Sequence, residues 1–228
     1  MEALDKMCSS AYIFDYGGTL DTSGRHWGKV LWRAWQQVGV PVDETRFRNA
    51  YVHAERVMGR TPVIAPDDSF RQTLDVKLQI ELEHAGCPSY KDQVLELVYE
   101  QTRRHTAHSV EVLRQLATHS RLALVSNFYG NIHTVLREFG FDGLFHDVIE
   151  SAVVGVRKPD PRIFLLGVKA LGVKPVEVTV VGDSMDKDIV PAREAGCQTI
   201  WLRGEQWNDT SVDETLPDRI ISDLNELL

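Results

Sequence analysis

The apolar residues of this chain follow two different periods in two regions. From about Arg121 onward, short apolar runs rich in β-branched residues alternate with stretches in which apolar residues recur every three or four positions. The short runs predict strands, and the longer stretches predict helices. The predicted strands span residues 12–14, 122–125, 148–149, 178–181, 199–202 and 220–221, and the predicted helices span 132–139, 163–171 and 189–195. Repeated strand–helix alternation indicates a parallel sheet with helices on both faces.

Between the first strand and about residue 106, the period is helical throughout. Amphipathic stripes begin near Trp27, Phe47 and Phe70. Ser69 is suitably placed to cap the third of these helices. The run Ser89–Asp92 has the pattern of a capping box and predicts the start of a fourth helix.

The change of period predicts how the chain is organised. We expect an α/β fold, in which a Rossmann-like, doubly wound parallel core carries an α-helical cap subdomain inserted after its first strand. The core is expected to comprise residues 1–21 and 107–228, and the cap residues 22–106.

Composition narrows the partners and the compartment. The formal net charge of −8 disfavours nonspecific binding to nucleic acid or to an anionic membrane. No apolar run approaches the roughly 20 residues that span a bilayer, and the first residues lack a signal-peptide pattern. Three widely separated cysteines, Cys8, Cys87 and Cys197, suggest a reducing compartment. We therefore expect a cytoplasmic protein with a small-molecule substrate. The sequence gives no indication of its oligomeric state.

Polar residues suited to chemistry stand where predicted strands end or in an adjoining loop. In chain order they are Asp15 with Thr19, Ser126 with Asn127, Lys158, and Asp183 with Asp188. Because ligands of an open α/β sheet bind beyond the carboxyl ends of its strands, we expect these groups to meet at one edge of the sheet.

The residue types indicate phosphoryl transfer. Asp15 and Asp183 can together hold a hard cation such as Mg²⁺, which prefers oxygen ligands. Lys158 and the Ser126 hydroxyl can receive phosphate oxygens and, with the cation, neutralise charge on a transferring phosphoryl group. The Asp15 carboxylate can attack phosphorus and form an aspartyl-phosphate.

These motifs, in this order and spacing and with a helical insert between the first two, resemble those of the haloacid dehalogenase-like hydrolase superfamily in its phosphatase branch. The resemblance covers nearly the whole chain. It rests on Phe14-Asp15, Gly18-Thr19-Leu20-Asp21, Ser126-Asn127, Lys158-Pro159-Asp160, and Gly182-Asp183-Ser184 with Asp188. It implies a Mg²⁺-dependent hydrolase of small phosphorylated metabolites.

The resemblance also implies roles for the residues that hold substrate. Asp15 would be the nucleophile and a metal ligand, and Thr19 would orient the nucleophile loop. Ser126 and Lys158 would hold phosphate. Asn127 would either contact phosphate through its backbone N–H or cap the following helix.

The implied metal site uses three further positions. Asp183 would ligate Mg²⁺, and Asp188 would either position Lys158 or support the metal. The family's ligand at the second position after the nucleophile is a backbone carbonyl, which Gly17 retains.

Gly17 is nevertheless a departure from the family pattern. Most phosphatases of the family carry an aspartate at this position, which protonates the leaving group and then activates water. A positioned proton donor is typically worth about 10²–10⁴-fold in rate. Because alkoxides need a proton to leave and acyl or aryl groups need it far less, we expect acyl and aryl phosphates to be turned over much better than alkyl phosphates. A long-lived phosphoenzyme at Asp15 is also expected.

Two other functions remain open. A 2-haloacid dehalogenase also lacks the second aspartate, but it usually has tyrosine there and needs no metal, whereas the Asp183/Asp188 pair is typical of metal binding. A catalytically impaired phosphate-binding relative would have no need for a nucleophile, a lysine and a metal carboxylate together. A phosphonatase-type route through a cap lysine is disfavoured, because the insert has no lysine between Lys29 and Lys77.

Three nearby residues are candidates for a substitute proton donor: His26, Asp21 and Arg25. The simpler interpretation of His26 is a surface histidine at the start of the first cap helix. The simpler interpretation of Asp21 is a cap of the turn that follows the nucleophile.

Overall fold

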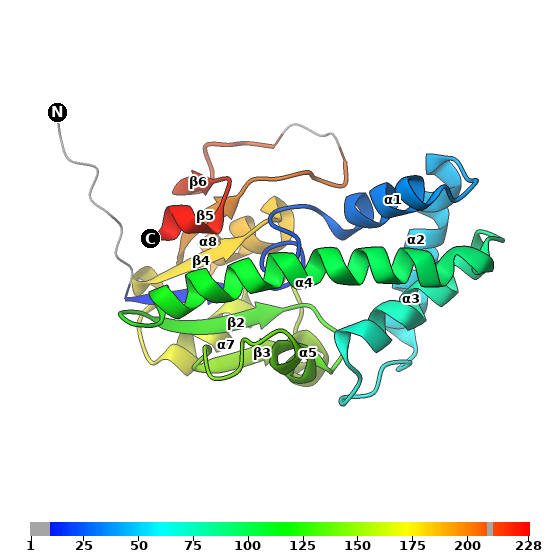
Figure 1. Ribbon diagram of the computed structural model, residues 1–228. Helices are drawn as coiled ribbons and strands as arrows, with labels where there is room; N and C mark the ends of the chain where they lie inside the picture. Colours follow the sequence, from blue (N-terminus) through cyan, green and yellow to red (C-terminus); the bar gives the residue numbers. More distant parts are fainter. Residues whose placement is uncertain (1–9, 209–211) are drawn as a thin grey trace.

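A parallel sheet forms the core of the computed structural model, which describes residues 10–208 and 212–228. The strands are β1 (Ala11–Phe14), β2 (Arg121–Ser126), β3 (Asp147–Glu150), β4 (Val178–Gly182), β5 (Gln198–Leu202) and β6 (Arg219–Ile221). Their order across the sheet is β3-β2-β1-β4-β5-β6, and every neighbouring pair is parallel (Figure 1). The predicted α/β class is therefore confirmed. Cys8 and the other N-terminal residues considered above lie outside the described residues.

Helices account for most of the remaining chain. The α-helices are α1 (Trp27–Val38), α2 (Glu44–Arg60), α3 (Phe70–His84), α4 (Lys91–Leu116), α5 (Ile132–Glu138), α6 (Ser151–Val154), α7 (Arg162–Leu171) and α8 (Val190–Glu194). A π-helical turn at Met185–Ile189 precedes α8, and short 3₁₀ turns lie at Pro88–Tyr90, Pro175–Glu177 and Leu224–Leu227.

The two faces of the sheet pack against different helices. On one face, Tyr12 and Phe14 of β1 join a cluster that includes α4 and α5. On the other face, Ala11 and Ile13 join a cluster that includes α7 and α8. Successive side chains of a strand point to opposite faces, so each strand contributes to both layers. This sandwich of helix, sheet and helix fixes the carboxyl ends of β1, β2 and β4 side by side.

Of the two helix starts that the sequence predicted to be capped by a serine, one is confirmed and the other is wrong. Ser69 caps α3 in a full capping box: its hydroxyl accepts from the Gln72 N–H at 3.2 Å, and Gln72 Oε1 accepts from the Ser69 N–H at 2.9 Å. The capping box predicted at Ser89–Asp92 is wrong. Pro88 starts a 3₁₀ turn there, which leads directly into α4. The N-cap residue of α4, Tyr90, has a helical backbone, and its side chain does not cap the helix.

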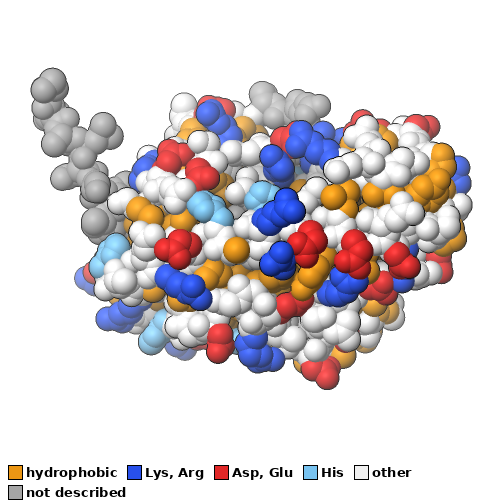
Figure 2. Space-filling model, in the orientation of Figure 1, with side chains coloured by type: hydrophobic (Ala, Val, Ile, Leu, Met, Phe, Trp, Pro, Cys, Tyr) orange, Lys and Arg blue, Asp and Glu red, His pale blue; other side chains and the backbone are white. Residues whose placement is uncertain are grey.

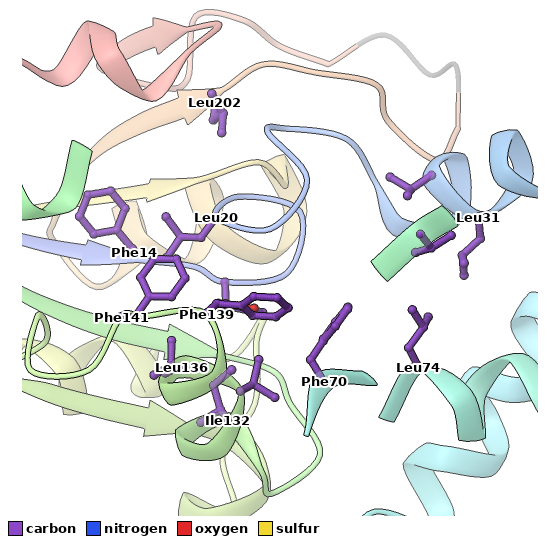
Figure 3. Close-up of a cluster of buried hydrophobic side chains, with 14 of the residues drawn as sticks. Phe14, Leu20, Leu31, Phe70, Leu74, Ile132, Leu136, Phe139, Phe141 and Leu202 are labelled. Carbon is purple, nitrogen blue, oxygen red and sulfur yellow. The ribbon is translucent and has the colours of Figure 1, made fainter. Parts of the chain in front are cut away.

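Helix α4 runs without a break across residue 106, where we predicted the cap to end. Figure 1 shows it lying along both the sheet and the bundle made by α1, α2 and α3. One hydrophobic cluster accompanies it, and Figure 3 shows this cluster extending from Phe14 of the sheet past Phe139 to Phe70 and Leu74 of α3. The Phe70 and Phe139 rings lie 5.3 Å apart. The division into core and cap at these boundaries remains a prediction.

The loop that follows β5 also connects the core to the helical bundle. The indole of Trp207 lies against Gly28 so closely that a Cβ on Gly28 would overlap it. The guanidinium of Arg48 lies 4.2 Å from the centroid of the same indole. The His26 N–H donates to the Glu205 carbonyl at 2.8 Å. These contacts place the start of α1, and His26 with it, beside the carboxyl end of the sheet.

On the face shown in Figure 2, basic and acidic side chains are interspersed. Across residues 10–208 and 212–228, no helix is both long and apolar enough to cross a membrane. Cys87 and Cys197 carry free thiols.

Candidate active site

The turn after β1 aims Asp15 out of the sheet. The Asp15 N–H still donates to the Val181 carbonyl of β4 at 3.0 Å, so its backbone is fixed by the sheet. The chain then turns through Gly18, whose φ of +103° is in the region that favours glycine. A Cβ on Gly18 would lie only 2.6 Å from Asp183 Cγ. Asp21 closes the turn by accepting from the Gly18 N–H at 2.7 Å, as its simpler interpretation predicted.

Charged and hydroxyl groups from three loops meet at this turn. The Lys158 ammonium donates to Asp15 Oδ1 and, at 2.7 Å, to Asp188 Oδ1. The Thr19 hydroxyl donates to Asp183 Oδ1 at 3.1 Å and also lies 3.3 Å from Asp15 Oδ2. All five side chains are buried. The structure thus brings together the nucleophile candidate Asp15, the lysine, and the two further carboxylates expected to serve the metal, Asp183 and Asp188, from positions up to 173 residues apart.

Asn127 holds the backbone of Lys158. Its side-chain N–H donates to the Lys158 carbonyl at 3.0 Å, and its Oδ1 accepts from the Lys158 N–H at 2.9 Å. Helix α5 is preceded by Asn131 at its N-cap position, so Asn127 does not cap it. Sequence reasoning missed this positioning role, because the partner lies 31 residues away. Ser126 is buried at the end of β2. Phosphate contact by Ser126 and Asn127 stays a prediction.

The buried carboxylates are suited to a divalent cation. One oxygen from each of Asp15, Asp183 and Asp188 lies within 4.8 Å of the others. Hard carboxylate oxygens are the ligands that Mg²⁺ prefers. Among the described residues, one ammonium, that of Lys158, pairs with two of these carboxylates, Asp15 and Asp188, so the cluster carries more negative than positive charge when all are ionised. The donor set and its charge therefore fit the cation that the sequence predicted.

The pKa values reflect the same crowding of negative charge. Burial raises the pKa of Asp15 to about 6, although Lys158 opposes the rise. Burial, with the neighbouring Asp188 and Asp15 carboxylates, raises the pKa of Asp183 well above its ordinary value. The absence of a side chain at Gly182 lets the Asp188 carboxylate lie close to the backbone beside Asp183, because a Cβ on Gly182 would be only 2.5 Å from Asp188 Cγ. A cation would relieve the repulsion that these shifts record.

A cavity of about 170 Å³ opens above this cluster, between the sheet and the helical bundle. Its floor includes Asp15, Gly17, Ser126, Lys158 and Asp183. Its walls and roof include Asp21, His26, Trp27, Tyr51, Glu55, Phe70, Leu74, Lys77, Phe128, Tyr129 and Lys187. The volume suits a small molecule with one end on the carboxylate cluster.

Lys77 is a cavity residue that sequence reasoning did not select. It is 7% exposed, its ammonium contacts Glu55 Oε1, and it lies 4.6 Å from the centroid of the Tyr51 ring. Burial lowers the pKa of Lys77, but Glu55 and other nearby groups raise it to a net value well above the ordinary one. The amine is therefore protonated and not nucleophilic, which argues against the phosphonatase-type route. The available signal was a lysine on the apolar face of α3, next to Leu74 and Leu78.

The expectation of a surface histidine at position 26 is wrong. His26 does stand at the N-cap of α1, but it lines the cavity and is half-buried against Trp207 and Tyr51, with ring centroids 5.2 and 6.0 Å away. Its Nδ1 accepts from the Gly28 N–H at 3.0 Å. Burial lowers the pKa of His26 to about 4. The ring is therefore neutral near pH 7 and unsuited to donate a proton to a leaving group.

A fully buried carboxyl, that of Glu81, lies one helical turn after Lys77 in α3. Glu81 is 0% exposed, and neither of its side-chain oxygens has a hydrogen-bond partner among the described residues. Burial raises the pKa of Glu81 from 4.5 to about 8. Glu81 is therefore protonated in the folded protein at neutral pH, whereas it is ionised in the unfolded chain.

Replacing Glu81 by methionine is expected to stabilise the protein, increasingly so as the pH rises. Below about pH 4.5, both states of the wild type hold the Glu81 proton and the two proteins differ little from this cause. Between pH 4.5 and 8 the unfolded wild type has lost the proton that the folded state keeps, so wild-type stability falls with pH. The resulting loss of wild-type unfolding free energy between these two pH values is at most about 5 kcal/mol. Urea unfolding of both proteins at pH 5, 6.5 and 8.5 measures it, and a constant difference across this range would contradict the prediction.

Comparison with known protein families identifies the class of protein that this fold and site define. The chain matches the family described as haloacid dehalogenase-like hydrolase over residues 10–196, and it belongs to this family. Solved structures share the fold. A dehalogenase is 20% identical with a TM-score of 0.63, and the match covers 95% of this chain and 94% of that one. A phosphatase of the family from Thermococcus onnurineus is 22% identical with a TM-score of 0.54, and the match covers 96% of this chain and 95% of that one. At these identities, the structures show the fold alone.

Two curated relatives with higher sequence identity are named as phosphatases. A phosphoserine phosphatase from Thermus thermophilus is 32% identical over 163 residues, which are 69% of this chain and 61% of that enzyme. A glyceraldehyde 3-phosphate phosphatase from Methanopyrus kandleri is 41% identical over 95 residues, which are 41% of each chain. The chain thus spans less than two thirds of the length of these two relatives.

Proposed function

We propose that this protein is a Mg²⁺-dependent hydrolase of small phosphorylated metabolites that works through an aspartyl-phosphate at Asp15. The observation that carries the proposal is the buried cluster of Asp15, Asp183 and Asp188 with Lys158, placed at the floor of a small cavity. The relatives named as phosphatases support the reaction class.

In the proposed reaction, an oxygen of the Asp15 carboxylate attacks phosphorus. The bond between phosphorus and the leaving-group oxygen breaks, and the electron pair departs with that oxygen. Lys158 and the Ser126 hydroxyl hold the phosphoryl oxygens. Water then attacks the phosphorus of the aspartyl-phosphate, which releases phosphate and restores the Asp15 carboxylate.

Other residues hold these groups in place. Thr19 orients the nucleophile loop through its contacts with Asp15 and Asp183. Asn127 fixes the Lys158 backbone, with its own backbone N–H proposed to contact phosphate. Mg²⁺ would be held by Asp15, Asp183, Asp188 and the Gly17 carbonyl. When bound, it would neutralise charge on the phosphoryl group.

The glycine at position 17 determines which leaving groups the proposed enzyme favours. No carboxyl at this position protonates the leaving group, and neutral His26 does not replace it. Substrates whose leaving group departs without a proton are therefore favoured, which means acyl and aryl phosphates over alkyl phosphates. The phosphoenzyme should also persist, because the same group would have activated water.

A phosphate-release screen tests the proposed function. Acyl, aryl and alkyl phosphates are incubated with the purified protein, with Mg²⁺ or with EDTA. We expect phosphate release from acyl and aryl phosphates that EDTA abolishes, and far slower release from alkyl phosphates. A burst of the leaving group, such as phenol from phenyl phosphate, should equal the enzyme concentration, because the phosphoryl group stays on Asp15 until water attacks it. Halide release from 2-haloacids without metal would instead establish a dehalogenase. Phosphate binding without turnover would establish a catalytically impaired relative.

The proposal also includes a cytoplasmic location and a small phosphorylated substrate as the main partner, without nucleic acid or membrane. The net charge of −8 and the cysteine usage of the chain support it. Fractionation of source cells with an antibody to the protein would test the location.

A further inference from the structure

The cavity has a second, polar end beneath the helical bundle. Lys77 of α3 and Glu55 of α2 form an ion pair there. Tyr51 lies under the Lys77 ammonium, and Lys187, from the π-helical turn after β4, lines the same end. Trp27, Phe70 and Leu74 line the cavity with apolar surface. A molecule that places its phosphate on Asp15 would therefore extend toward these charges.

The polar end carries more positive than negative charge. Burial raises the pKa of Glu55, but Lys77 and also Lys187 lower it further, so this carboxylate is ionised between two ammonium groups. Glu81, the other carboxyl near Lys77, is buried and keeps its proton at neutral pH. Two cations therefore face one anion, and a further negative group would be attracted.

Lys77 also retains hydrogen-bonding capacity. An ammonium has three N–H donors, and Glu55 is its hydrogen-bond acceptor in the part of the chain that the structure describes. Desolvating an ammonium is costly unless its donors are satisfied. An apolar residue at position 77 would continue the stripe of Leu74 and Leu78 without that cost. A lysine here, pointing into a cavity, is best explained by a ligand that it binds.

We propose that Lys77, positioned by Glu55, binds a carboxylate on the leaving group, so that the substrates are small phosphorylated carboxylic acids. Glu55 remains partly exposed and can accept from a hydroxyl or ammonium group next to that carboxylate. The small cavity limits the leaving group to a few carbons or one ring. This inference rests on the proposed function, because it takes the phosphate to lie on Asp15.

Two aryl phosphates isolate the carboxylate. Phenyl phosphate and 3-carboxyphenyl phosphate share the ring and the leaving oxygen and differ in the carboxylate alone. We expect the wild type to have a KM at least about tenfold lower for the carboxylated substrate, the scale of one charge-assisted hydrogen bond. Lys77→Met should remove that preference by raising the KM for 3-carboxyphenyl phosphate, with kcat and the KM for phenyl phosphate nearly unchanged.

Lys91→Met is the matched control. Lys91 also pairs with a carboxylate of α3, Asp75, but neither residue lines the cavity. This variant should keep the wild-type preference. If Lys77→Met does not fold, Lys77→Gln replaces it, because the amide leaves a polar partner for Glu55. Equal KM values for the two substrates in the wild type, or an equal rise for both in the Lys77 variant, would overturn the proposal.

Binding to a non-turning enzyme separates this proposal from the proposed function. Calorimetric titration of both aryl phosphates into Asp15→Asn, with Mg²⁺ present, reports the leaving-group preference without catalysis. Tighter binding of the carboxylated compound that disappears in Asp15→Asn/Lys77→Met supports the subsite, even if the wild type releases no phosphate and the proposed function fails. Equal affinities would reject the subsite, even if the wild type is an active phosphatase.

Discussion

Asp15→Asn is expected to abolish phosphate release, with a fall in kcat/KM of at least about 10⁴-fold, as when a nucleophile is removed from a covalent catalyst. The asparagine amide keeps the size of the side chain but cannot form the acyl-phosphate bond. The substitution also removes one anionic partner of Lys158 and one of the three clustered oxygen ligands. Phosphate release from phenyl phosphate, measured for both proteins at equal concentration, tests the prediction.

The variant should remain folded. Asp15 is one of three clustered buried carboxylates, it shares the Lys158 ammonium with Asp188, and burial already raises its pKa to about 6. Removing that charge relieves repulsion between Asp15 and Asp188, so we expect the melting temperature to be at least that of the wild type. Loss of activity could then not be assigned to unfolding.

Asp186→Asn provides the matched control. It changes the same charge on an exposed residue of the turn that carries Asp188, outside the cluster of ligand oxygens. Its turnover should equal that of the wild type. Mass spectrometry of protein quenched in acid during turnover should find the phosphoryl group on the peptide that contains Asp15. Wild-type turnover by Asp15→Asn, or a phosphoryl group on another peptide, would contradict the assignment of the nucleophile.

The sequence was sufficient for the sheet because buried parallel strands need continuous apolar runs. The runs at 122–125 and 178–181 are of this kind, and both became central strands. The grouping of Asp15 and Asp183 followed from topology, since the carboxyl ends of neighbouring parallel strands meet, and Lys158 joins them from the loop between α6 and α7. The capping box at Ser89 failed because Pro88 favours a local 3₁₀ turn over a capped helix start.

The residues of the cavity roof were harder to predict, because their environment is made by distant segments. His26 is covered by Trp207, from a loop 181 positions further along the chain. Lys77 meets its partner on another helix, and the pattern of α3 alone marks it as an unusual lysine on an apolar face without indicating what it faces. The reciprocal bonds between Asn127 and the Lys158 backbone likewise need the relative positions of two loops.

Gly17→Asp is expected to raise turnover of alkyl phosphates by about 10²–10⁴-fold, the usual worth of a positioned proton donor. The position has room for a side chain. A Cβ on Gly17 would meet only the edge of the Trp27 indole, at 3.8 Å from Nε1 and 3.9 Å from Cδ1, which is ordinary contact. Gly17 is not among the glycines with positive φ, so aspartate introduces no backbone strain there. The new carboxyl would line the same cavity as Asp15.

Gly17→Asn separates proton transfer from the other effects of a side chain at this position. Asparagine fills nearly the same space beside Trp27 but cannot deliver a proton to the leaving oxygen. We therefore expect kcat for an alkyl phosphate to rise in the aspartate variant only. The rate at which the enzyme first releases phenol from phenyl phosphate should change little in either variant, because phenolate leaves readily without a proton. The phenol burst should also shrink in Gly17→Asp, because the carboxylate would activate water against the aspartyl-phosphate.

If alkyl turnover is unchanged in a folded Gly17→Asp protein, another group already supplies the proton. The cavity-lining Asp21, whose pKa burial raises to about 8, would then be the first residue to substitute.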